Sequence, residues 1–219
     1  MQNLVARVIA PHRSIRDKHT CPALQKQTDT LSATYVDNFA VFGLDPKLVD
    51  HQLNLIVKEF DKLGIATHEN TAASSNTAFV GLQFHDCCVS IKNSRLTKLK
   101  YALDELLARS KCSRRMLEVI VGHISWAMML FRPALTALNY VYSFGRDDPH
   151  ALIKIPFEVR KELFQIRSIL PLLRADVRSA WHPLVHASDA SSTGFGVCSR
   201  WASPAYVGNL GRQIPIMFA

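Results

Sequence analysis

The sequence predicts an α+β fold, in which short paired strands come first, long helices follow and a further hairpin comes last. Three observations lead to this prediction. β-Prone runs separated by turn residues occupy the stretch before residue 92. Leucines and other apolar residues recur at helical spacing over residues 92–183, and two more β-prone runs follow from residue 184. The chain of 219 residues, 48% of them hydrophobic, suffices for one large domain or two small ones.

The first hairpin is predicted around Asp37-Asn38. The runs 31–36 and 39–42 are rich in β-branched and aromatic residues. Asp and Asn tolerate the positive φ angles that a tight two-residue turn requires. We therefore expect Asp37 and Asn38 at the tip of a two-stranded hairpin.

A helix is predicted from Pro46 to about Leu63. Asp45 is a good N-cap residue, and proline fits the first turn of a helix because its missing N–H has no partner there. Gly64 is suited to the end of the helix. Its apolar residues recur at steps of three and four, which indicates one buried stripe: Val49, Leu53, Ile56, Phe60 and Leu63.

A second hairpin is predicted after the polar loop 67–77. Residues 78–84 are expected to form one strand, and residues 89–91 are expected to return beside it. The last hairpin is expected from strands 184–189 and 194–199, joined by a turn of serine, threonine and glycine.

Three helices are predicted between these hairpins. Ser94 caps the first, which ends near residue 108; Ser113 caps the second, which runs towards residue 142 with a kink at Pro133; Pro156 opens the third. Each has one apolar face. The residues expected inside are Leu96, Leu99, Leu103, Leu106, Leu117, Ile120, Ile124, Met128, Leu163, Ile166 and Leu170.

The charge favours a polyanionic partner. There are 26 Lys and Arg against 18 Asp and Glu, a net charge of +8 with a pI near 9.4. Much of the excess lies between Lys92 and Arg115, a stretch with eight basic residues and only two acidic ones, Asp104 and Glu105. Such a stretch suits a phosphate backbone, although an ordinary solvated helix face is the alternative.

Two carboxylates stand out. Asp37 is expected at a hairpin tip, from which a carboxylate can reach a cation. Asp189 is expected at the end of a strand, before a small polar turn. For each, an ordinary turn residue is the alternative. His123 and Trp126 lie near the apolar face of their helix and are expected in the core, and Tyr140 and Tyr142 are expected to serve in packing.

Cysteine usage and hydropathy predict an intracellular protein without a membrane span. The five cysteines have no disulfide-framework spacing, and His85-x-Cys87-Cys88 has no second pair at zinc spacing. The longest apolar run, residues 124–131, is shorter than a bilayer span requires.

Several motifs, in order, resemble those of reverse transcriptases of retrotransposons, of the tyrosine-recombinase or gypsy-like kinds. Tyr-Val-Asp-Asn at residues 35–38 resembles the Tyr-x-Asp-Asp box, and Phe-Val-Gly-Leu-Gln-Phe at residues 79–84 resembles the primer-grip hairpin. Val-Gly-His-Ile-Ser-Trp-Ala at residues 121–127, with the basic helices, resembles the thumb and connection. The Asp189 hairpin is similar to the start of ribonuclease H. The likeness covers roughly residues 30–200.

The resemblance implies an RNA-directed DNA polymerase using Mg²⁺. It divides the chain into a partial palm (1–91), a helical thumb and connection (92–183) and the first hairpin of a ribonuclease H-like domain (184–219). Asp37 and Asp189 would be metal ligands, with Asn38 as a weakened catalytic neighbour. Template–primer duplex would be bound by Tyr35, Phe79, Gly81, Leu82, Lys92, Arg95, Lys98, Arg114 and Arg115.

The departures from this pattern predict an inactive piece of such an enzyme. Asn38 replaces the second Asp of the box. The family has a further palm Asp upstream of the box, and in this chain the only acidic residues before the box are Asp17 and Asp29. Residues 190–219 contain no Asp or Glu. A partner chain or an upstream polyprotein region would have to supply the fingers and the remaining palm. The alternatives are a non-catalytic nucleic-acid-binding protein derived from the thumb and a frame with no selected function.

Overall fold

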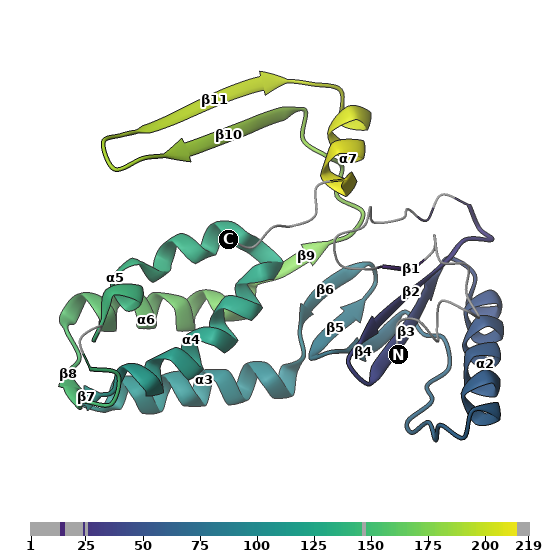
Figure 1. Ribbon diagram of the computed structural model, residues 1–219, viewed down its shortest axis with the longest axis horizontal. Coiled ribbons are helices and arrows are strands. Elements are labelled where there is room, and N and C mark those ends of the chain that lie inside the picture. Colours follow the sequence, from purple (N-terminus) through teal and green to yellow (C-terminus); the bar gives the residue numbers. More distant parts are fainter. Residues whose placement is uncertain (1–13, 16–23, 25, 146–147, 214–219) are drawn as a thin grey trace. The chain divides into compact units, whose positions relative to one another are not determined.

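In a computed structural model of the chain, the described residues are 14–15, 24, 26–145 and 148–213 (Figure 1). They form several helices and small, mostly antiparallel sheets, which confirms the predicted α+β class at this coarse level. The chain divides into two compact units. One consists of Met1–Ser74 with Ser179–Ala219, and the other of Ser75–Arg178.

The first unit contains a three-stranded sheet in the order β1 (Ser14–Ile15), β2 (Thr30–Tyr35) and β3 (Asn38–Gly43). β1 is parallel to β2, and β2 is antiparallel to β3. Tyr35 pairs with Asn38, so the turn residues are Val36 and Asp37. The predicted turn at Asp37-Asn38 is therefore wrong by one residue, because the ladder between the strands extends to Asn38 and overrides the local turn preference.

Helix α2 (Pro46–Lys62) packs on this hairpin and has the predicted ends. The side chain of Asp45 accepts a hydrogen bond from the backbone N–H of Lys47 at 2.9 Å, and Gly64 follows the helix with a φ of +69°. Phe60 is buried, and its ring meets that of Phe39 edge-on, with 5.4 Å between the ring centroids. Leu63 is 55% exposed and lies outside the buried stripe.

The first unit also contains the hairpin of β10 (Leu184–Ala190) and β11 (Phe195–Trp201), followed by helix α7 (Pro204–Gln213). The two strands form a sheet of their own, as predicted, and β11 is exposed along its whole length. The sequence did not indicate α7. Two of its glycines make room for Trp181: a Cβ on Gly211 would lie 2.6 Å from the Trp181 ring.

The second unit begins with an antiparallel sheet in the order β4 (Asn76–Phe79), β5 (Leu82–His85), β6 (Cys88–Ile91) and β9 (Arg174–Asp176). The prediction of one strand over residues 78–84 is wrong. Val80 and Gly81, with φ of +51° and +81°, form a two-residue turn inside it. Positive φ at both turn positions matches the right-handed twist of the flanking strands.

Pairing of β6 with β9 joins residues 75–91 to the helices that lie between these strands in sequence. The compact units consequently change at residues 74 and 178, whereas the resemblance places domain boundaries at residues 91 and 183.

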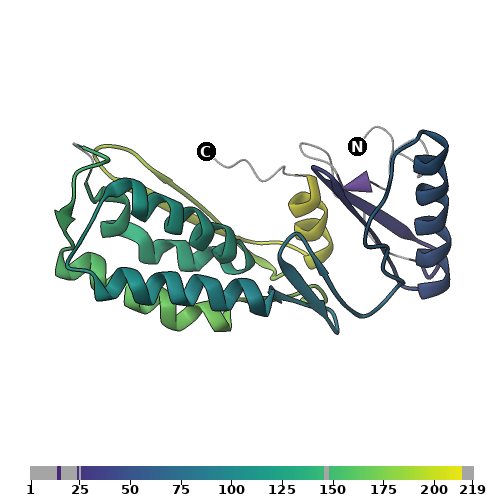
Figure 2. The same ribbon diagram turned by 90° about the horizontal axis from the view of Figure 1, so that it is seen from below.

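The remaining helices of the second unit are α3 (Asn93–Ala108), α4 (Arg114–Met128), η2 (Met129–Leu138), α5 (Asn139–Ser143), α6 (Phe157–Ile169) and η3 (Leu170–Leu172). α3 lies beside both α4 and α6 (Figure 2). Short strands β7 (Lys111–Cys112) and β8 (Ile153–Lys154) pair at one end. Ser113 caps α4 as predicted, accepting from the N–H of Met116 at 3.3 Å. α3 begins before Ser94, with Lys92 at the cap position and no side-chain cap.

The segment Arg114–Ser143 is long and apolar enough to cross a membrane by length and composition alone. It is not one α-helix in the structure, because Phe131 has non-helical backbone angles (φ −147°, ψ 79°) two residues before Pro133. The kink that Pro133 predicts is thus present. α4 also buries an apolar face in the core, which gives the apolar residues of this segment a structural role inside the unit.

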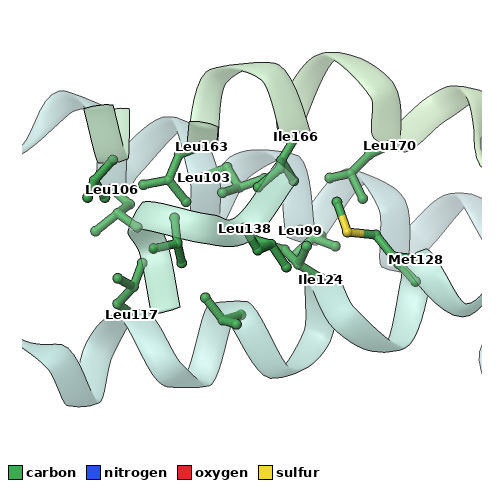
Figure 3. Close-up of a cluster of buried hydrophobic side chains, with 14 of the residues drawn as sticks. Leu99, Leu103, Leu106, Leu117, Ile124, Met128, Leu138, Leu163, Ile166 and Leu170 are labelled. Atoms are coloured by element: carbon green, nitrogen blue, oxygen red, sulfur yellow. The ribbon is translucent and has the colours of Figure 1, made fainter. Parts of the chain in front are cut away.

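The core of the second unit forms where α3, α4, α6 and η2 meet (Figure 3). Leu103 from α3 faces Leu163 and Ile166 from α6, and all three are fully buried. Helical periodicity predicted this core correctly, apart from Leu96 and Ile120, which are only partly buried at its edge. The other predicted core residues that are buried are Leu99, Leu106, Leu117, Ile124, Met128 and Leu170.

Charged side chains on α6 bind α6 to α3 and α5. Arg167 forms a two-point ion pair with Asp104 of α3, with 2.8 Å between Nη2 and Oδ2. Arg160 donates to the carbonyls of Leu107, at 2.5 Å, and Arg109, where α3 ends. Buried Glu162 accepts from backbone N–H groups at the start of α5.

Candidate nucleic-acid interface

The tip of the β2–β3 hairpin presents a carboxylate on a strained turn. Tyr35 and Val36 are 58% and 77% exposed, and Asp37 and Asn38 are exposed beside them. Val36 has a φ of +53°, which is unfavourable for a β-branched residue. The amide Nδ2 of Asn38 donates to Oδ1 of Asp37 at 3.0 Å. Strained non-glycine residues occur most often at functional sites, which makes this tip a candidate functional site.

The described residues around Asp37 do not assemble a two-metal site. Two cations roughly 3.5–4 Å apart need several carboxylate oxygens. Among the described residues no group of three or more His, Cys, Asp or Glu side chains could hold a metal ion. The carboxylate of Asp29 accepts from the N–H of Lys26 at 2.8 Å, and Asp17 lies outside the described residues. Asp189 is exposed on β10, opposite Gly196.

The Val80-Gly81 turn adjoins the start of α3. The backbone N–H of Lys92 donates to the carbonyl of Gly81 at 3.0 Å. A Cβ on Gly81 would collide with the end of the Arg95 side chain and would lie 3.1 Å from its Cδ. Phe79 and Leu82 pair across the turn and are half-buried. The motif at residues 79–84 is therefore in contact with the basic helix that follows it.

Arg95 also connects this turn to α4. Its Cζ lies 3.8 Å from the centroid of the Trp126 ring, a cation–π contact. Its Nη2 lies 3.4 Å from Nδ1 of His123. The expectation that His123 and Trp126 are core residues is wrong for His123, which is exposed, and incomplete for Trp126, which is half-buried at the core edge. Their spacing of three on α4 could have indicated a shared face, but only the tertiary structure brings Arg95 to that face.

The remaining predicted cations divide into two groups. Lys92 and Lys98 are exposed, each three residues from Arg95 along α3. The side chain of Arg115 is 68% exposed and comes within 3.9 Å of Glu118. Arg114 instead holds α4 to the end of α5, because its guanidinium donates to the carbonyls of Tyr142 and Phe144 at 3.0 and 2.6 Å. These bonds give Arg114 a structural role.

We call six exposed or half-buried residues on or next to α3 and α4 the α3–α4 basic face. Arg95, His123 and Trp126 contact one another within it. On α4, residues at steps of four share a face, so Arg115 lies about 12 Å along the axis from His123. Its members are Lys92, Arg95, Lys98, Arg115, His123 and Trp126.

Comparison with known proteins adds no identification. No protein-family model matches the chain, and no curated protein matches it significantly. Function is therefore inferred from the α3–α4 basic face and the hairpin tip, together with the motif resemblances in the sequence.

Proposed function

We propose that the chain is a piece of a retroelement RNA-directed DNA polymerase that binds template–primer duplex and does not by itself catalyse nucleotidyl transfer. The observation that carries the proposal is the position of Arg95, which touches both the Gly81 turn and Trp126. The motif resemblance relates that turn to a primer grip and α4 to a thumb. Arg95 joins the two into one surface.

The chemistry of this surface favours a nucleic acid strand. Exposed lysines and arginines bind phosphates and release condensed counterions, which drives association at low salt. Aromatic side chains among the cations are typical of surfaces that contact bases or sugars. Four cations of the α3–α4 basic face, Lys92, Arg95, Lys98 and Arg115, would give a slope of log K against log[salt] of about −3 to −4 on duplex DNA.

Binding without catalysis follows from the carboxylates. Asp37 is exposed at the hairpin tip, but among the described residues no group of three or more His, Cys, Asp or Glu side chains could hold a metal ion. The proposal therefore includes no metal-dependent step for this chain alone. A partner chain or an upstream polyprotein region would have to bring the remaining ligands.

Salt-dependent duplex binding tests the first half of the proposal. Lys92→Gln, Lys98→Gln and Arg115→Gln together should flatten the slope by about 3, since each removes one phosphate contact. The matched control replaces the three exposed lysines of α2, Lys47, Lys58 and Lys62, which changes the net charge equally. Fluorescence anisotropy with a labelled primer–template reports both. Equal slopes for the two triple variants would contradict the proposed surface.

Primer extension tests the second half. We expect no template-dependent incorporation with Mg²⁺ by the isolated chain. Incorporation that Asp37→Ala abolishes would show that the chain is an active polymerase and would overturn this part of the proposal.

A non-catalytic nucleic-acid-binding protein is the second candidate, because the whole basic face lies within the unit Ser75–Arg178. Sequencing the transcript upstream of Met1 separates the candidates. A reading frame that continues into a fingers-like segment supports the polymerase piece, and a confirmed start at Met1 supports the independent binding protein.

A further inference from the structure

We propose that Arg95 and His123 form a phosphate-binding pair in which His123 is fixed as the tautomer protonated on Nε2. The ligand is a non-bridging oxygen of one backbone phosphodiester. The choice of ligand rests on the proposed nucleic-acid binding; the tautomer rests on side-chain geometry alone.

Arg95 is held in place before any ligand binds. Its guanidinium lies on the Trp126 ring, 3.8 Å from Cζ to the centroid, and its side chain fills the space that glycine leaves at residue 81. Stacking on an aromatic face leaves the edge of the guanidinium plane available for hydrogen bonds. A phosphate that meets this arginine therefore encounters donors whose rotamer freedom is already reduced, which lowers the entropic cost of binding.

The contact with Arg95 determines the protonation pattern of neutral His123. A guanidinium has only donors, so Nη2 must donate to Nδ1 across the 3.4 Å that separate them. Neutral imidazole carries one proton, which must then lie on Nε2. The His123 side chain is exposed, and among the described residues Nε2 has no hydrogen-bond partner. His123 thus offers an N–H donor beside the guanidinium of Arg95.

Two adjacent donors of this kind suit an anionic oxygen, and their surroundings favour a nucleic acid backbone over an isolated anion. Lys92 and Lys98 lie three residues on either side of Arg95, about 4.5 Å each along the α3 axis. A row of cations extends the attraction along a polyanionic strand. We therefore assign the pair to a phosphodiester within a strand, and an acidic peptide is an alternative that the experiment must reject.

The tautomer can be measured without any ligand. ¹⁵N NMR of the full chain, with His123 assigned by comparison with His123→Gln, distinguishes a protonated from an unprotonated ring nitrogen. At a pH where the ring is neutral, we expect Nε2 to carry the proton, and we expect Arg95→Ala to produce a mixture of tautomers. A predominantly Nδ1-protonated ring in the unaltered chain would overturn the inference.

Two substitutions of His123 separate its two nitrogens. The amide nitrogen of Gln reaches the place of Nε2, whereas Asn can replace only the Nδ1 side. His123→Asn should weaken binding of a primer–template duplex about tenfold, the effect of one lost hydrogen bond to a charged group. His123→Gln should stay within about threefold of the unaltered chain, because it keeps an outward donor. Equal loss in both variants would contradict an Nε2 contact.

Duplexes with one neutral methylphosphonate at successive positions identify the phosphate. The unaltered chain should lose affinity at one such position, and the loss there should be smaller in His123→Asn, because only the Arg95 contact then remains. Inorganic phosphate and a polyglutamate peptide serve as competitors against the bound duplex. Displacement of half of the duplex by either competitor below roughly 10 mM, the scale of weak anion binding, would overturn the assignment to a nucleic acid strand. Failure of the unaltered chain to bind duplex at low salt overturns the proposed function and this ligand together. Duplex binding with no phosphate coupled to His123 overturns this inference alone.

Discussion

Glu162 is a buried charge that joins α6 to α5 in the second unit. It is 9% exposed, and its two carboxylate oxygens accept separate hydrogen bonds from the backbone N–H groups of Tyr140 and Val141, each at 2.9 Å. These N–H groups lie in the first turn of α5, where no earlier turn of that helix supplies acceptors. The carboxylate thus acts as a cap supplied by another helix, at the positive end of the α5 dipole.

Glu162→Ala should lower the free energy of unfolding by about 3 kcal/mol, because an orphaned buried polar group costs about 1–3 kcal/mol. The Val141 N–H is buried and should carry most of this loss, while the Tyr140 N–H is part-buried and can regain water. Glu162→Gln keeps one acceptor oxygen and should lose about half as much. Glu158→Gln, an exposed position on the same helix, should change stability by less than about 0.5 kcal/mol.

Urea unfolding followed by Trp126 fluorescence measures these differences. Trp126 is the one tryptophan of residues 75–178, so replacing Trp181 and Trp201 by Phe isolates its signal. Equal stability of Glu162→Ala and Glu158→Gln would contradict the capping role of Glu162. A loss of stability in Glu162→Gln as large as that in Glu162→Ala would contradict the presence of two separate hydrogen bonds.

The hydrogen bond from Arg167 lowers the pKa of Asp104, so the ion pair stabilises the fold above about pH 4 and this contribution disappears as the pH falls further. In urea unfolding, Asp104→Asn should therefore be less stable than the unaltered chain near neutral pH and equally stable at low pH. A difference in unfolding free energy that stays constant with pH would contradict this. Val36→Gly should stabilise the β2–β3 hairpin by about 0.5–1 kcal/mol, because glycine adopts a positive φ without strain. Amide hydrogen exchange in β2 and β3 should therefore be slower in this variant. Val36→Ala keeps the strain and should not slow the exchange. Leu163 is fully buried, so Leu163→Ala should lower the free energy of unfolding by about 2–5 kcal/mol. Phe164 is 61% exposed, so Phe164→Ala should lower it by less than about 0.5 kcal/mol. Comparable losses in the two variants would show that the core is placed wrongly.

Local signals in the sequence were sufficient for the helices and their buried faces. Leucines at steps of three and four identify the core because a helix buries one stripe whatever its neighbours are. The caps at Asp45 and Ser113 were also predictable, since an N-cap bond spans only two or three residues. Both features depend on residues close together in the chain.

Features set by distant residues were not predictable in this way. The ladder of β2 with β3 imposes positive φ on Val36 against its own preference. The sequence also contained no sign of the structural role of Arg114, because the carbonyls that it holds belong to residues 28 and 30 positions later. His123 was expected inside because its neighbours are apolar, and only the approach of Arg95 from another helix gives it a role at the surface.

The bonds of Arg160 have a consequence for the order in which the second unit forms. The carbonyls of Leu107 in the last turn of α3 and of Arg109 directly after it accept from a side chain 51 to 53 residues later in the chain. During synthesis α3 leaves the ribosome well before its partner, at about 5–20 residues per second. Its end should therefore fray for several seconds and become protected only when α6 arrives. Pulse-labelling of amides during refolding should accordingly show the end of α3 gaining protection together with α6.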